Sequence, residues 1–138
     1  MKKRILFLLL SLLLMAAIFY FSDMPAPQSS SVSKPIAEST GLSQKTVRKI
    51  AHLTCFFLLS GSLYGFFSTF RKLRRPYLFS YPITVIYAVT DEIHQHFVEG
   101  RSCELRDVLI DAAGALLFLL LWWAVLQFLR RKKKSVSE

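Results

Sequence analysis

Residues 87–101, YAVTDEIHQHFVEGR, place acids and histidines where an apolar run ends. The apolar run 77–89 precedes this cluster, and a second run, 112–129, follows it closely. Ionisable side chains at or inside a membrane boundary are energetically costly and usually serve a function. The polar cluster therefore indicates the region in which this protein acts.

The apolar residues of the chain are gathered in long blocks. The chain has 138 residues, is 53% hydrophobic and has a mean hydropathy of +0.39. Because a membrane span needs about 20 residues, we predict an all-α fold, an integral membrane four-helix bundle that forms one domain over 1–138. The predicted spans are 5–21, 50–70, 77–98 and 107–129.

The segments between the predicted spans suggest a topology. Residues 22–45 are rich in Ser and Pro, which favours a solvated outer loop with at most a short helix near 36–39. Ser43 and Thr46 suit the start of the second helix, as cap and first turn. Most of the 18 Lys and Arg residues lie in 2–4, 71–75 and 130–134. The positive-inside rule then places both termini in the cytoplasm, with a basic tail over 130–138. A cleaved signal peptide is the alternative for the first span.

The net charge of +9 has a membrane explanation. Basic clusters beside membrane spans face anionic lipid headgroups, so membrane lipids are the expected partners. No nucleic-acid-binding motif accompanies the charge, and we predict no nucleic-acid partner. The two cysteines, Cys55 and Cys103, are predicted to be free thiols, with a bridge between them as the alternative.

Helical spacing sorts the polar residues into faces. Asp91 and Gln95 are four residues apart and share one face of the third span. Counted from Tyr77 at 1.5 Å per residue, Asp91 lies in the outer half of the membrane. The alternative is a helix that ends at Val89, so that Asp91 and Glu92 cap a wet outer loop.

Two other spans carry matching polar faces. Arg48 and His52 are four residues apart at the start of the second span, and Asp107 and Asp111 are four apart at the start of the last. If these faces turn toward Asp91, they form a charged cavity that opens outward. Crowded carboxylates do not all ionise easily, and arginines fix some of them in the charged form.

The residue types suggest roles within this cavity. Asp91, Glu92 and His52 are the candidate acid–base groups. The candidate substrate-binding residues are Arg48, Gln95, Arg101, Asp107 and Asp111, with the arginines suited to an anionic headgroup such as phosphate. We assign no metal site and no cofactor. A divalent cation held by Asp91, Asp107 and Asp111 is the open alternative, because all-oxygen ligation suits Mg²⁺ or Ca²⁺.

These motifs resemble the VanZ-like family of bacterial membrane proteins. The resemblance covers about residues 46–120 and rests on RKIAH at 48–52, the stretch 87–101, and DVLIDAAG at 107–114. Phe56 stands where a Tyr is expected, and Phe118 where a small residue is expected. The resemblance implies a multi-pass protein of the bacterial cytoplasmic membrane. The family's namesake is associated with low-level resistance to teicoplanin, a glycopeptide antibiotic.

Three functions are compatible with this sequence. The first is an enzyme or enzyme-like site that acts on a lipid-linked or cell-envelope molecule. The second is a non-catalytic protein that binds and masks an envelope precursor or an amphiphilic, glycopeptide-like drug. The third is a proton-coupled carrier, ranked last because four short spans could serve it only as an oligomer. The sequence leaves the ligand, the existence of a reaction and the oligomeric state open.

Overall fold

The computed structural model describes residues 1–136, which form five helices and no strand. The helices are α1 (Lys2–Ser22), α2 (Ala26–Thr40), α3 (Gln44–Ser68), α4 (Tyr77–Gln95) and α5 (Leu105–Val136). The predicted all-α class is confirmed. The basic segment from 130 to 136 continues α5, and residues 137–138 of the predicted tail lie outside the described residues.

Three of the helices in the described part, α1, α3 and α5, are long and apolar enough to cross a membrane. The fourth predicted span, α4, is not one of them. Its Ser80, Thr84 and Asp91 are buried against the bundle and lower its apolar content. The number of spans therefore stays a prediction.

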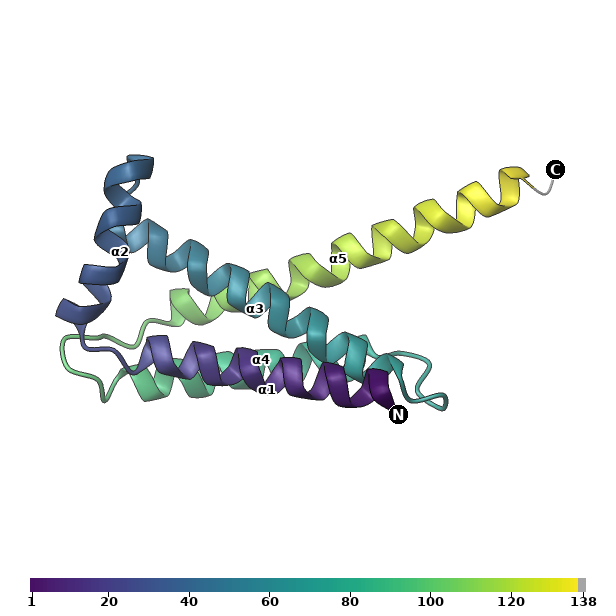
Figure 1. Ribbon diagram of the computed structural model, residues 1–138, viewed down its shortest axis with the longest axis horizontal. Coiled ribbons are helices and arrows are strands. Elements are labelled where there is room, and N and C mark those ends of the chain that lie inside the picture. The colour runs from purple at the N-terminus through teal and green to yellow at the C-terminus, as the bar shows by residue number, and fades with distance from the viewer. Residues whose placement is uncertain (137–138) are drawn as a thin grey trace.

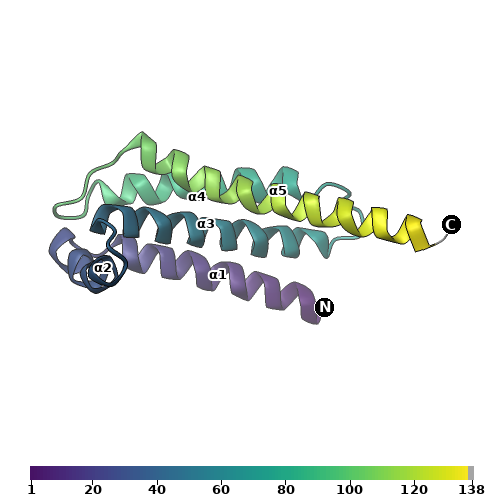
Figure 2. The same cartoon turned by 90° about the horizontal axis from the view of Figure 1, so that it is seen from above.

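The helix ends sort into two groups at opposite ends of the molecule. Figure 1 shows the N-terminus and the α3–α4 loop at one end, with the C-terminal part of α5 extending beyond them. The other end carries α2 and the α4–α5 loop. In the second view α1, α3, α4 and α5 run in roughly the same direction (Figure 2), whereas Figure 1 shows the C-terminal part of α5 turning away from the other helices.

The segment predicted as a loop contains a 15-residue helix, α2, and that part of the prediction is wrong. Pro25 precedes its first turn, and Gly41, at φ +70°, ends it. The amide of Ala26 donates to the carbonyl of Glu99 at 3.1 Å. Gly100 has φ +73°, and a Cβ there would lie 2.9 Å from Cβ of Ala26. Contact with the α4–α5 loop therefore holds the start of α2.

Helix α3 begins at Gln44, directly after the predicted cap and six residues before the predicted span 50–70. The side chain of Ser43 accepts a hydrogen bond from the amide of Thr46 at 3.1 Å, which confirms the predicted cap. Lys45, Arg48 and Lys49 therefore lie on the first turns of the helix, ahead of the predicted span.

Helices α3 and α5 share the most extensive helix–helix contact in the described structure. At Gly114, an added Cβ would collide with the backbone carbonyl of Leu53, so only glycine permits this approach. Two helical turns after Leu53 on α3, the Ser60 hydroxyl donates to the carbonyl of Ala115 at 3.1 Å. This tight packing fixes the face of α5 that carries the acids relative to α3.

Helix α1 is tied to its neighbours by polar contacts between apolar faces. The Ser11 and Ser62 hydroxyls lie 2.9 Å apart between α1 and α3. The Tyr87 hydroxyl of α4 donates to the carbonyl of Met15 at 2.7 Å. Such bonds between helices orient them where lipid and protein are equally apolar.

Candidate functional site

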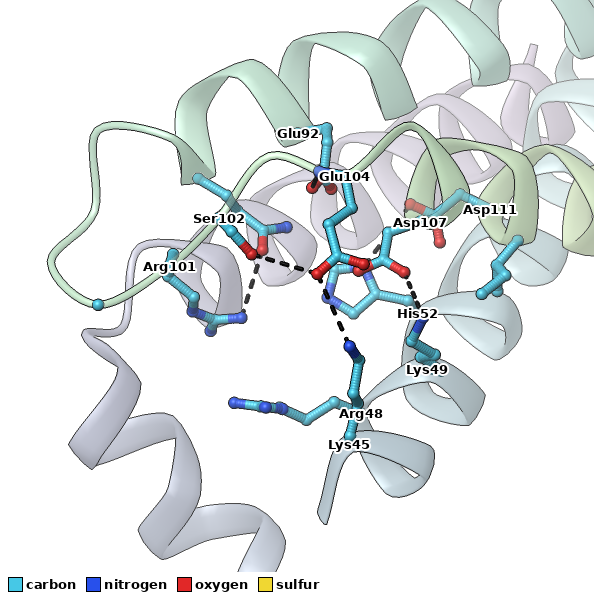
Figure 3. Close-up of a pocket in the computed structure, with 13 residues that line it drawn as sticks. Lys45, Arg48, Lys49, His52, Glu92, Arg101, Ser102, Glu104, Asp107 and Asp111 are labelled. Carbon is cyan, nitrogen blue, oxygen red and sulfur yellow. Dashed lines mark hydrogen bonds and ion pairs between the residues drawn. The ribbon is translucent and has the colours of Figure 1, made fainter. Parts of the chain in front are cut away.

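A polar pocket of about 160 Å³ lies at the end of the bundle that carries α2. Its walls come from the start of α3, the end of α4, the α4–α5 loop and the start of α5 (Figure 3). The pocket is lined by seven of the eight predicted site residues, namely Arg48, His52, Glu92, Gln95, Arg101, Asp107 and Asp111. The three polar helix faces therefore do meet, while the roles of these residues stay predictions.

Asp91 is the predicted site residue that does not line the pocket. Its side chain is 3% exposed, and its Oδ2 accepts hydrogen bonds from the Ser22 hydroxyl at 2.8 Å and from Nε2 of Gln95 at 3.0 Å. Helix α4 continues past Asp91 to Gln95, so the alternative of a helix that ends at Val89 is wrong. Asp91 thus positions Gln95 and links α4 to the end of α1.

Glu92 lines the pocket but is only 2% exposed. Its Oε1 accepts a hydrogen bond from the backbone amide of Glu104 at 2.8 Å, just before α5 begins. A carboxylate at a helix start also meets the positive end of the helix dipole. Glu92 therefore joins the end of α4 to the start of α5.

Two ion pairs cross from α3 to the opposite wall. Lys49 Nζ lies 2.6 Å from Oδ1 of Asp107, and Lys45 Nζ lies 3.7 Å from Oε1 of Glu104. All four side chains are partly exposed, so each pair contributes at most about 1 kcal/mol. Neither lysine nor Glu104 was among the predicted site residues. The spacing of Lys45, Lys49 and His52 along one side of α3 was the signal that could have found the lysines.

His52 and Asp111 form the inner wall of the pocket. Nδ1 of His52 lies 3.7 Å from Oδ2 of Asp111, within ion-pair range but beyond a hydrogen bond. Asp111 is 1% exposed, and neither carboxylate oxygen has a hydrogen-bond partner among residues 1–136. A buried carboxylate with so little compensation is unfavourable for folding, and it faces a histidine that can carry a proton.

The arginines occupy the other side of the pocket. The Arg101 guanidinium donates to three neutral oxygens, which are the carbonyls of Met24 and Phe21 at 3.1 and 3.0 Å and Oε1 of Gln95 at 3.3 Å. Burial, with the nearby Arg48 second, lowers the pKa of Arg101, although a guanidinium stays charged in proteins. These bonds tie the α4–α5 loop to the end of α1 without neutralising the charge.

Arg48 is the least constrained cation of the pocket. Within residues 1–136, its side chain makes no ion pair and no hydrogen bond. Figure 3 shows the Arg48 and Arg101 guanidinium groups on the same side of the pocket, away from Asp107 and Asp111. Two guanidinium groups without a carboxylate between them form a favourable place for an anion.

The carboxylates do not combine into a metal centre. In the part of the chain that the structure describes, no group of three or more His, Cys, Asp or Glu side chains is placed to hold a metal ion. Asp91 bonds Ser22 and Gln95, while Asp107 pairs with Lys49. The alternative of a divalent cation shared by Asp91, Asp107 and Asp111 therefore has no support.

These features define a helical, multi-pass membrane protein with a polar pocket at one end of its bundle. The chain belongs to the VanZ/LLP1 family, whose model matches residues 7–128. The match confirms the resemblance seen over about 46–120 and extends it through α1 and most of α5. Comparison with curated proteins and with solved structures finds no match.

Proposed function

We propose that this protein binds the anionic headgroup of a lipid-linked or cell-envelope molecule at the outer face of the bacterial cytoplasmic membrane. The observation that carries the proposal is the pair Arg48 and Arg101, whose guanidinium groups share one pocket without a carboxylate partner in the described residues. A phosphate or carboxylate between them would relieve their mutual repulsion and accept several charge-assisted hydrogen bonds.

The proposed topology has four spans, α1, α3, α4 and α5, with both termini in the cytoplasm. The basic clusters 2–4, 71–75 and 130–133 gather at the end that carries the termini (Figure 1). The positive-inside rule assigns that end to the cytoplasm. The pocket, at the opposite end, then opens at the level of the outer headgroups.

The contact between His52 and Asp111 favours a second candidate function, in which the pocket also moves a proton during a reaction on the bound headgroup. His52 would be the acid–base group, and Asp111 would orient it and balance its charge. Asp91, predicted as an acid–base group, supports this candidate only through Gln95, because it does not line the pocket. Binding is the function that the geometry favours.

Lipid analysis of the purified protein tests the proposal. Wild-type protein should co-purify with an anionic lipid or lipid-linked precursor, and Arg48→Ala should retain roughly tenfold less of it, since a charge-assisted bond contributes about 1.5 kcal/mol or more. Arg48→Ala removes a charge without removing a hydrogen bond or an ion pair between described residues. The control is Arg106→Ala, an exposed cation outside the pocket. Equal lipid content in the wild type and Arg48→Ala would contradict the proposal.

A link to glycopeptide resistance comes from the family alone. The proposal connects the two through an envelope precursor or an amphiphilic drug that shares the headgroup pocket. Teicoplanin susceptibility of cells that carry wild-type protein, Arg48→Ala or no protein measures that link. If the three strains are equally susceptible, this protein does not confer the namesake's resistance. Headgroup binding is then tested by the lipid analysis alone.

A further inference from the structure

A second, apolar cavity of about 240 Å³ adjoins the polar pocket. It lies between the end of α1, the inner side of α2 and the start of α3, and apolar side chains such as Ile18, Ala51 and Cys55 line it. Arg48, His52 and Arg101 line both cavities. The two cavities therefore meet at the arginines that the proposed function assigns to an anion.

Helix α2 supplies the outer wall of the apolar cavity. Its sequence is rich in Ser, and Val32 and Ile36 are its two large aliphatic residues. Both line this cavity although each stays about half exposed, at 47% and 49%. The small residues Ser29 and Ser33 are buried and let α2 approach the bundle. The apolar stripe of an otherwise polar helix is thus directed at a cavity that protein atoms leave unfilled.

One cavity is polar and carries the two arginines, and the other is apolar. Together they match an amphiphile, which has a charged headgroup and a hydrocarbon chain. A phosphate at Arg48 and Arg101 brings the attached group to the entrance of the apolar cavity, because the same arginines line both. An apolar wall favours hydrocarbon over water by about 25 cal/mol per Å² of buried area. A free phosphate would occupy only the polar pocket, whereas a lipid phosphate would occupy both cavities.

Resting on the proposed function, we propose that the apolar cavity beneath α2 holds the first part of the hydrocarbon chain of a lipid phosphate whose phosphate group lies at Arg48 and Arg101. Helix α2 then selects for the chain, and the arginines select for the charge. The protein recognises the junction between headgroup and chain.

Three probes separate the two contributions in full-length protein purified in detergent. Dioleoyl phosphatidic acid carries the phosphate and the chains, glycerol 3-phosphate carries the phosphate alone, and dioleoylglycerol carries the chains alone. Wild-type protein should bind phosphatidic acid more tightly than either partial probe. Dioleoylglycerol binding as tight as phosphatidic acid binding would overturn the proposal, because phosphate and chain would then not act together.

The discriminating variant is Ala51→Phe, which fills the apolar cavity from an exposed position on α3. It should weaken phosphatidic acid binding about tenfold, equivalent to losing roughly two buried methylene groups, and leave glycerol 3-phosphate binding unchanged. The unchanged binding also shows that the variant is folded. Ala124→Phe makes the same substitution at an exposed position of α5 outside both cavities and should change neither affinity.

The outcomes distinguish this inference from the function on which it rests. If Arg48→Ala weakens both phosphate probes but Ala51→Phe leaves phosphatidic acid binding intact, headgroup binding stands and the apolar cavity is not the chain site. If Arg48→Ala changes neither probe, the proposed function fails, and the inference fails with it.

Discussion

His52 on α3 and Asp111 on α5 face each other at the inner wall of the pocket, with Nδ1 and Oδ2 3.7 Å apart. Beside this contact, Gly114, three residues after Asp111, meets the carbonyl of Leu53, the residue after His52. A backbone approach that only glycine permits thus sets the spacing of these two side chains at the inner wall of the pocket.

Replacement of Asp111 by Asn should stabilise the protein. The carboxylate is buried without a hydrogen-bond donor from residues 1–136, so removing its charge should raise the free energy of unfolding by about 1 kcal/mol. Thermal unfolding in detergent measures the change. Asp107→Asn is the matched control: it breaks the ion pair with Lys49 and should lower stability by up to about 1 kcal/mol. A larger loss in Asp111→Asn than in Asp107→Asn would identify Asp111 as a structural residue.

Gly114→Ala should separate α3 from α5. The added methyl group has no space beside the Leu53 carbonyl, and overpacking of this kind lowers the free energy of unfolding by about 1–3 kcal/mol. Ala113→Val adds volume on the exposed side of the same helix and should change stability by less than about 0.5 kcal/mol. Equal stability of Gly114→Ala and wild type would show that the two helices can move apart without loss.

Much of the site could be predicted because helical periodicity constrains which residues share a face. Pairs four residues apart placed Arg48 with His52 and Asp107 with Asp111, and the lengths of the apolar runs placed these pairs at one end of the bundle. Periodicity predicts the helix face on which a residue lies, but not which neighbouring side chains cover that residue. Asp91 lies on the expected side of α4, yet Ser22 and Gln95 shield it from the pocket.

Helix α2 could not be predicted from its own residues. Ser and Pro are weak helix formers in isolation, and Pro35 lies inside the helix. The helix is held by contacts from distant parts of the chain, such as the bond from Ala26 to Glu99 and the burial of Ser29 and Ser33. Such tertiary contacts override local propensity. The apolar cavity, whose outer wall is α2, was missed for the same reason.

Cysteine labelling should report the orientation of the pocket. In the described structure both cysteines are free thiols: Cys103 is exposed in the α4–α5 loop, and Cys55 is half-buried on α3. A membrane-impermeant maleimide should label Cys103 from outside the cytoplasmic membrane, and Cys103→Ser should abolish the signal. In that background, a cysteine introduced by Lys72→Cys in the α3–α4 loop should react only after the membrane is permeabilised. The reverse pattern would place the pocket in the cytoplasm.

Alanine substitution at Gly100 and at Gly41 separates two effects on stability, the strain of a positive φ and the steric clash of an added Cβ. Both have positive φ, +73° and +70°, so alanine at either position is strained by about 1–2 kcal/mol. Only at Gly100 would the new Cβ also meet a neighbour, Ala26, while Gly41 has nothing within 4 Å. Gly100→Ala should therefore lower the free energy of unfolding more than Gly41→Ala does.

The same pair of variants tests whether the α4–α5 loop positions the anion site. Gly100 precedes Arg101, whose guanidinium holds the end of α1 through the Met24 and Phe21 carbonyls. Displacing the loop from Ala26 should shift that guanidinium away from Arg48, so Gly100→Ala should weaken binding of glycerol 3-phosphate several-fold. Gly41→Ala, in the turn before α3 and outside the lining of both cavities, should leave the affinity unchanged. Equal affinities in the two variants would mean that Arg101 holds its place independently of the contact between Gly100 and Ala26.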